Sequence, residues 1–257
     1  MTLPLPPLAL LASLLVVGCA GIVRGYAGFG FSALSVAGLT LFLPPAKVVP
    51  PIFMLEVLAS FSLLRSAVPD IDWRWLGWLI AGNALALPLG TLVLAWVPEA
   101  PLRLVIGGLL ALGAVLLRRG ISLGLAPTAP ARLGVGLVSG FVNGVAAIGG
   151  IAVAVLLATS QMAPAVMRAT LIALFLFTDL YALAASAVVS THAPTALLGT
   201  DTWRWALWLA PAMLLGIQVG RRWFSGVSAE RFRRRVLDLL IAIASISVLR
   251  SVLDVIA

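Results

Sequence analysis

The chain consists mainly of long apolar stretches separated by short polar or proline-containing breaks. A helix needs about 20 apolar residues to cross the hydrocarbon core of a membrane. Ten stretches approach or exceed that length, and the pattern therefore predicts an all-α polytopic membrane protein. They cover residues 5–24, 28–43, 47–67, 74–96, 101–118, 132–145, 147–160, 165–190, 203–220 and 233–254. No Lys or Arg precedes the first stretch, so we expect it to be a membrane segment and not a signal peptide.

Composition and charge narrow the class further. Hydrophobic residues make up 62% of the chain and charged residues 10%, whereas soluble domains carry about 25% charged residues. The net charge of +8 comes from Arg residues scattered between apolar stretches, which favours contact with membrane lipid over nucleic acid. With Cys19 and His192 as the sole Cys and His, we expect no metal site and no cofactor.

An internal repeat organises the chain. With an offset of 119 residues, AGIVRGYAGFG (20–30) aligns with SGFVNGVAAIG (139–149), and with an offset of 130, WRWLGWL (73–79) aligns with WRWALWL (203–209). Chance does not readily place the pattern W-R-W-x-x-W-L twice in one chain. The alignment predicts a first repeat over 1–119, a cytoplasmic linker over 120–131 and a second repeat over 132–257.

The distribution of positive charge predicts how the two repeats are oriented. If 5–43 and 132–160 each form one long helix, Lys and Arg divide nine to seven between the two sides. If each folds as a hairpin that enters and leaves on the same side, twelve lie on one side and four (Lys47, Arg103, Arg204 and Arg250) on the other. The second division obeys the positive-inside rule. Each repeat is then a glycine-interrupted helical hairpin followed by three transmembrane helices, and the two repeats have inverted topology.

The glycine-rich strings allow two interpretations. Small residues let helices pack closely in membranes, and this alone accounts for many such strings. Alternatively, each string breaks a helix, and the next helix begins near Gly28 and near Ala147. A helix N-terminus inside the protein presents free N–H groups and a partial positive charge to an anion. Inverted repeats would direct two such ends at one central point.

Two polar residues lie at equivalent positions of these strings. Arg24 falls within an apolar stretch, where a charge is costly and usually functional, unless its side chain extends to the membrane surface. Its repeat mate is Asn143, a neutral amide that both donates and accepts hydrogen bonds. A guanidinium beside neutral donors suits a small oxyanion.

Two acidic residues, Glu56 and Asp179, also lie within apolar stretches. Neither has an Arg or Lys within one helical turn, and burial favours the neutral form of an unpaired carboxyl group. Such a group can load a proton together with an anion, although it could equally be a protonated acid bonded to a backbone carbonyl. Ser60 lies one turn from Glu56 and is the repeat mate of Asp179, which predicts that both acids share one zone.

The string GIVRGYAGFGFSALSVAGLTLFLPP (21–45) resembles the opening signature of the TauE/SafE family, also called the 4-toluenesulfonate uptake permease family. The resemblance extends to the second glycine-rich string, to the turn at Pro164, and to Gly216 and Gly220 followed by a basic loop. It implies a multi-pass protein of the bacterial inner membrane that carries sulfite, sulfonates or related organic anions.

These observations together predict a secondary active transporter of a small anionic, sulfur-containing substrate such as sulfite or an organosulfonate. We expect protons to be the coupling ion through Glu56 or Asp179, and the substrate to lie near the bilayer midplane. An anion channel or passive pore is the alternative, an enzyme is not expected, and a homodimer is left open. The expected substrate contacts are Arg24, Gly25, Gly28, Phe29 and Gly30 in the first repeat, and Asn143, Gly144 and Gly149 in the second.

Overall fold

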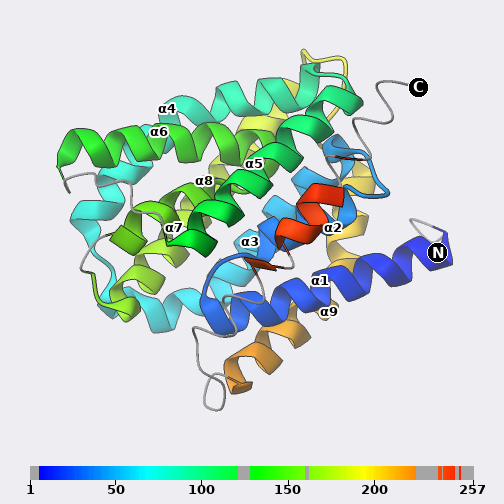
Figure 1. Cartoon of the computed structure of the whole chain (residues 1–257). Helices are drawn as coiled ribbons and strands as arrows, with labels where there is room; N and C mark the ends of the chain where they lie inside the picture. Colours follow the sequence, from blue (N-terminus) through cyan, green and yellow to red (C-terminus); the bar gives the residue numbers. More distant parts are fainter. Residues whose placement is uncertain are drawn as a thin grey trace.

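The computed structural model describes residues 6–120, 128–159, 162–223, 237–238, 240–246 and Leu249. The helices pack into one bundle (Figure 1), which confirms the all-α prediction. Most of the expected linker and most of the stretch over 233–254 lie outside the described residues. The helices are α1 (Pro7–Ala27), α2 (Phe31–Leu39), α3 (Pro45–Ala67), α4 (Trp73–Trp96), α5 (Glu99–Arg119), α6 (Ala129–Ala146), α7 (Gly149–Thr159), α8 (Pro164–Ser190) and α9 (Thr200–Trp223), with a 3₁₀ turn, η1, at Val68–Asp70.

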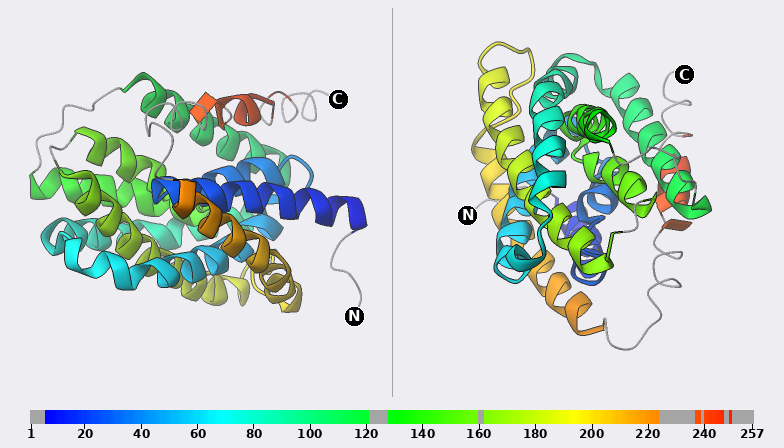
Figure 2. Two further views of the ribbon diagram at one scale, coloured as in Figure 1. Left: turned by 90° about the horizontal axis from the view of Figure 1, so that it is seen from below. Right: turned by 90° about the vertical axis from the view of Figure 1, so that its left-hand side faces the viewer.

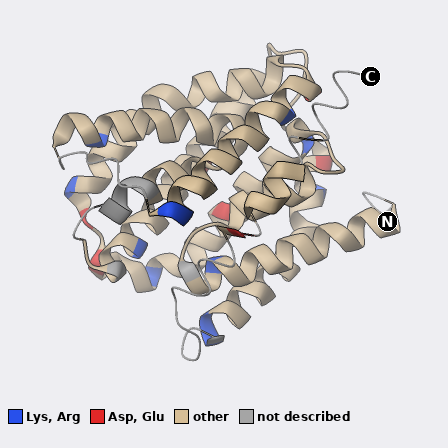
Figure 3. Cartoon of the chain, in the orientation of Figure 1, with Lys and Arg blue, Asp and Glu red and all other residues tan. Residues whose placement is uncertain are grey.

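The outer surface of the bundle suits lipid. In the described part of the chain, five helices (α1, α3, α4, α5 and α8) are long and apolar enough to cross a membrane. Large apolar side chains point outward, and Leu8, Phe61 and Leu207 expose 81%, 70% and 72% of their surface. Charged residues are sparse along the helices (Figure 3). Such a surface would aggregate in water, and the chain is a multi-pass membrane protein.

Local sequence explains where several helices begin. Proline stands in the first turn of α1, α3 and α8, a position where the backbone N–H has no helical partner and the ring costs nothing. The carboxylate of Asp72 accepts hydrogen bonds from the backbone N–H groups of Arg74 and Trp75, at 3.1 and 3.0 Å, and so caps α4. Asp72 is therefore a helix cap.

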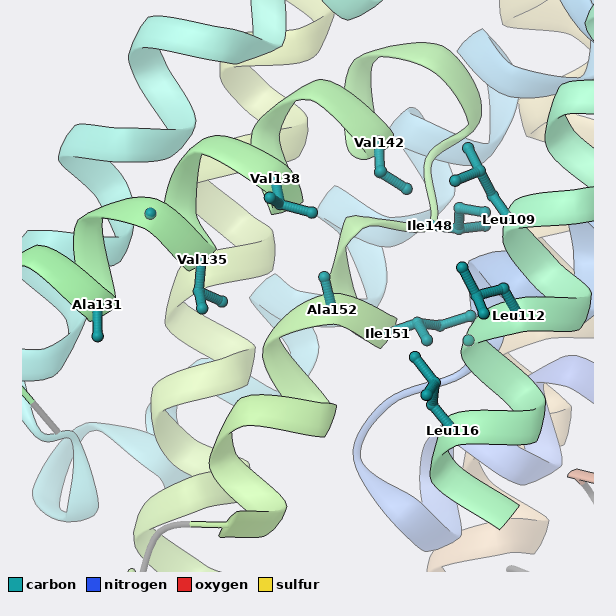
Figure 4. Close-up of a pocket in the computed structure, with 12 residues that line it drawn as sticks. Leu109, Leu112, Leu116, Ala131, Val135, Val138, Val142, Ile148, Ile151 and Ala152 are labelled. Atoms are coloured by element: carbon teal, nitrogen blue, oxygen red, sulfur yellow. The ribbon is translucent and has the colours of Figure 1, made fainter. Parts of the chain in front are cut away.

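Both predicted helix breaks are present. After α1, Gly28 and Gly30 adopt left-handed conformations with φ of 81° and 92°, which glycine tolerates without strain. The chain then returns along α1 as α2, so that a Cβ placed on Gly38 would lie 2.7 Å from Val16. In the second half the chain reverses at Ala147, whose φ is 57°, and α7 runs back beside α6 (Figure 4).

The two limbs of each hairpin differ in length. Helix α1 has 21 residues and is about 30 Å long, enough for a full span, whereas α2 has nine residues. Helices α6 and α7 have 18 and 11 residues. The first limb of a hairpin is thus long and the second short.

Two helix pairs carry the tightest packing. Helix α1 lies against α9, and α4 lies against α6 (Figures 1 and 2). Glycines line both contacts: a Cβ on Gly21 would lie 2.6 Å from the Met213 carbonyl oxygen, and one on Gly136 would lie 2.6 Å from the Leu79 carbonyl oxygen. The glycine-rich strings therefore serve close packing as well as the helix breaks.

The relative direction of the central helices α3 and α8 tests whether the two repeats have inverted topology. The backbone amide of Asp72, which follows α3, donates to the Thr170 hydroxyl near the start of α8, at 3.1 Å. Arg24 contacts both Glu56, which precedes Asp72 in the chain, and Phe175, which follows Thr170. The order of contacts is reversed, so α3 and α8 run antiparallel. Since α3 and α8 are repeat mates, this direction supports the inverted repeat, as does the exchange of α1 and α4 for α6 and α9 in the two tight pairs.

The glycine contacts predict a position-dependent cost of adding a methyl group. A Cβ on Gly140 would lie 2.5 Å from the Asn83 carbonyl oxygen, whereas one on Gly134, in the same helix, meets nothing within 4 Å. Because overpacking costs about 1–3 kcal/mol, we expect Gly140→Ala to lower the melting temperature by about 2–10 °C. Gly134→Ala is the matched control and should leave it unchanged. Thermal unfolding of the purified variants in detergent measures both, and equal melting temperatures would contradict the packing assignment.

Candidate functional site: a buried ion pair at a helix break

Arg24 lies in the last turn of α1 and is fully enclosed, with 0% of its surface exposed. Its Nη1 donates to the Gly28 carbonyl at 2.8 Å, and its Nη2 donates to the Ser60 hydroxyl at 2.8 Å. The guanidinium also stacks over the Phe175 ring, 4.6 Å from the ring centroid. The side chain therefore points into the bundle, and the alternative in which it extends to the membrane surface is wrong.

Glu56 has a charged partner, contrary to the sequence-based expectation that it is unpaired. Its Oε2 lies 3.2 Å from Nη2 of Arg24, and both side chains are buried. The expectation failed because a search within one helical turn cannot find a cation on another helix. Pairing lowers the cost of burying each charge in an apolar interior.

The other oxygen of Glu56 lies at the start of α2. Its Oε1 accepts hydrogen bonds from the Ser32 hydroxyl at 2.8 Å and from the Ser32 backbone N–H at 3.3 Å. Ser32 is the second residue of α2, so this N–H is among those that have no helical partner. The carboxylate thus occupies the kind of position, a helix N-terminus beside a guanidinium, that the sequence predicted for a substrate oxyanion.

The second repeat holds a neutral counterpart at its own break. The Asn143 amide nitrogen donates to Asp179 Oδ1 at 2.9 Å, and the amide oxygen accepts from the Gly149 backbone N–H at 3.2 Å. Gly149 is the first residue of α7, so a side-chain oxygen satisfies this helix N-terminus too. Asp179 is 2% exposed, and its hydrogen-bond partner is the Asn143 amide and not a cation.

The repeat relates the two sets of contacts. Arg24 and Ser60 are joined by a side-chain hydrogen bond, as are their repeat mates Asn143 and Asp179. At an offset of 119 residues the mate of Glu56 is Phe175, whose ring lies over Arg24. The two breaks therefore meet at one place, where the first repeat supplies an ion pair and the second an amide, a carboxyl group and an aromatic ring.

Comparison with known proteins identifies the family of this chain. The model of the sulfite exporter TauE/SafE family matches residues 13–247, nearly the whole chain. The chain belongs to the TauE/SafE family. This is a family of membrane transporters. No curated protein and no solved structure matches the chain.

The remaining predicted contacts of this TauE/SafE protein divide by role. Gly28 and Gly30 form the break itself. Gly25 packs against Ile217 of α9, and Gly144 packs against α4, so these two glycines let helices approach each other. Phe29 is half-buried against the apolar core.

Sequence reasoning missed two residues of the site, Ser32 and Phe175. Ser32 follows the break directly and is a polar residue in the first turn of α2, so its position offered a signal. Phe175 could have been found as the repeat mate of Glu56. In the described part of the chain, no group of three His, Cys, Asp or Glu residues could hold a metal ion.

A separate cavity of about 480 Å³ lies between α5 and the α6–α7 hairpin (Figure 4). Leu, Val, Ile, Ala and Gly residues line it, among them Leu112, Val138 and Ile151. It offers no charged or hydroxyl side chain to an anion, so the polar groups at the breaks remain the candidate site.

The buried ion pair predicts strong energetic coupling between its two members. Removing one partner leaves an uncompensated charge and costs about 3–5 kcal/mol, whereas replacing both with apolar residues costs far less. We expect Arg24→Met and Glu56→Leu each to destabilise the protein, and the double variant to be more stable than the sum of the two losses implies. A double-mutant cycle measured by unfolding in detergent tests this.

The matched control for that cycle is the Arg118–Asp238 pair, whose two side chains are 39% and 54% exposed. Exposed pairs contribute about 0–1 kcal/mol, so its coupling should be small. Additive losses at Arg24 and Glu56 would contradict the ion-pair assignment.

Proposed function

We propose that this TauE/SafE protein is a proton-coupled secondary transporter of a small sulfur-containing anion, sulfite or an organosulfonate, in the bacterial inner membrane. The substrate binds between the two helix breaks, near Arg24 and Asn143, and crosses unchanged. Membership in a family of sulfite exporters supports the substrate class.

One observation carries this proposal: the protein's own carboxylate occupies an anion site. Glu56 lies 3.2 Å from the Arg24 guanidinium and accepts hydrogen bonds from the N-terminus of α2. When Glu56 takes up a proton, it no longer neutralises Arg24, and the guanidinium and the free N–H of Ser32 are left without an anion. An incoming oxyanion restores the charge balance. Proton uptake and anion binding are thereby linked at the same atoms.

Asp179 provides a second place for the proton. It is buried and shares this electrostatic environment, because the charges of both Glu56 and Arg24 act on it. The amide nitrogen of its partner, Asn143, can donate to an oxygen of either the charged or the protonated carboxyl group. The enclosure of Arg24 also favours a carrier over a channel, since a pore needs an open path through the bundle.

Substrate binding should depend on Arg24 more than on Asn143. A charge-assisted contact contributes about 1.5–3 kcal/mol and a neutral hydrogen bond about 1 kcal/mol. We expect Arg24→Ala to weaken sulfite binding by roughly 10- to 150-fold, Arg24→Lys to restore it partly because the forked donor is lost, and Asn143→Ala to weaken it by about tenfold or less. Calorimetric titration in detergent measures the affinities.

The control for binding is Arg119→Ala at the end of α5, which removes an equal charge from an exposed position and should leave the affinity unchanged. Normal binding by Arg24→Ala would show that the substrate binds elsewhere.

Coupling should depend on the two carboxyl groups. Glu56→Gln or Asp179→Asn removes a titrating group while keeping a similar shape, so we expect transport to lose its dependence on pH while binding stays measurable. Uptake into proteoliposomes with and without a proton gradient tests this. If both variants keep the wild-type pH response, protons are not carried by these groups. Saturable flux marks a carrier, whereas conductance without a gradient would mark a channel.

A further inference from the structure

A second arginine, Arg168 in the first turns of α8, reaches the same helix break. Its Nη2 lies 3.4 Å from the Gly25 carbonyl oxygen, and its side chain crosses Gly28, where an added Cβ would lie 2.6 Å from Arg168 Cγ. Arg24 donates to the carbonyl of the same Gly28. The two guanidinium side chains therefore flank one residue of the break.

Arg168 has no acidic partner among the described residues. The ion pairs of this part of the chain are Arg24–Glu56, Arg103–Glu99, Arg118–Asp238 and Arg204–Asp201. The charged groups that act on Arg168 are two further cations, Arg24 and Arg221. A half-buried cation with cationic neighbours is unfavourable unless an anion joins it.

The geometry of α8 connects Arg168 to the rest of the site. Phe175 and Asp179 follow Arg168 at seven and eleven residues along the helix, spacings that return to the same face. Phe175 contacts Arg24, and Asp179 contacts Asn143. One face of α8 thus carries Arg168 and the two other site residues in line.

We propose that Arg168 is the second cation of the substrate site and gives it a preference for doubly charged oxyanions. This inference rests on the proposed function, because it assumes that an anion binds beside Arg24. It specifies the charge of the substrate and names the residue that selects it.

Charge balance explains the preference. With Glu56 ionised and Asp179 protonated, Arg24 is neutralised and Arg168 is left over. With both Glu56 and Asp179 protonated, as in the proposed coupling, the site carries two positive charges. A doubly charged anion neutralises both, whereas a singly charged one leaves a cation uncompensated where the surroundings screen charge poorly.

Sulfate and methanesulfonate separate charge from shape, since both are tetrahedral sulfur oxyanions and carry two and one negative charges at neutral pH. We expect the wild-type protein to bind sulfate more tightly, as measured by calorimetric titration in detergent. Arg168→Gln should weaken sulfate binding by about tenfold or more and methanesulfonate binding by less than about threefold. Arg168→Lys, which keeps the charge, should retain the preference, and Arg119→Gln is the charge-matched control.

Several outcomes would overturn this inference. An equal loss for both anions in Arg168→Gln leaves their affinity ratio unchanged and would mean that Arg168 does not select charge, whereas no loss for either anion would mean that Arg168 only caps the end of α1. In either case, loss of all binding in Arg24→Ala would leave the proposed function standing. Conversely, if Arg24→Ala binds both anions normally while Arg168→Gln still changes their ratio, the proposed site at Arg24 fails and the role of Arg168 survives. A wild-type protein that binds sulfite but neither of these two anions overturns the inference and leaves the proposed function standing.

Discussion

The burial of one guanidinium in an apolar bundle is the constraint on which the central structure depends. Arg24 is fully enclosed, so its charge and donors need partners inside the protein. Four elements meet that need: the break after α1 supplies the Gly28 carbonyl, α3 supplies Glu56 and Ser60, α8 supplies the ring of Phe175, and α2 holds Glu56 by its N-terminus. The broken hairpin and the central helix pair are arranged around this one charge.

In both halves, polar side chains meet a helix N-terminus at a helix break, but the side chains differ in charge. At the first break a cation and a carboxylate are opposed, whereas at the second an amide bridges a carboxyl group and a helix N-terminus. Only in the first half does the arrival of a proton therefore leave a cation without its counter-ion. This asymmetry within a repeated fold is what the proposed coupling of anion and proton requires, because two identical ion pairs would each hold their own counter-ion.

Much of the fold could be predicted from the sequence, because each membrane-spanning helix requires an apolar stretch of sufficient length. The glycine-rich strings offered breaks near Gly28 and Ala147 as one of two interpretations, and the position of Arg24 inside an apolar stretch offered burial as one of two. The repeat identified Asn143 as its counterpart. Each of these inferences concerns residues that are neighbours along the chain or that are related by the fixed spacing between the repeats. Both properties are visible in the sequence.

Contacts between different helices could not be predicted from the sequence. Glu56 looked unpaired because its partner lies on a different helix, and Arg168 drew no attention because nothing near it in sequence indicates that it crosses Gly28. The crossing positions of α1, α3 and α8 bring these charges together, and those positions depend on glycine contacts that act only when whole helix surfaces pack. The sequence by itself determined that the protein spans a membrane, and it identified the candidate helix breaks and the candidate buried charges. Only the tertiary structure decided which charge faces which, because electrostatic pairing depends on distance through space and not on separation along the chain.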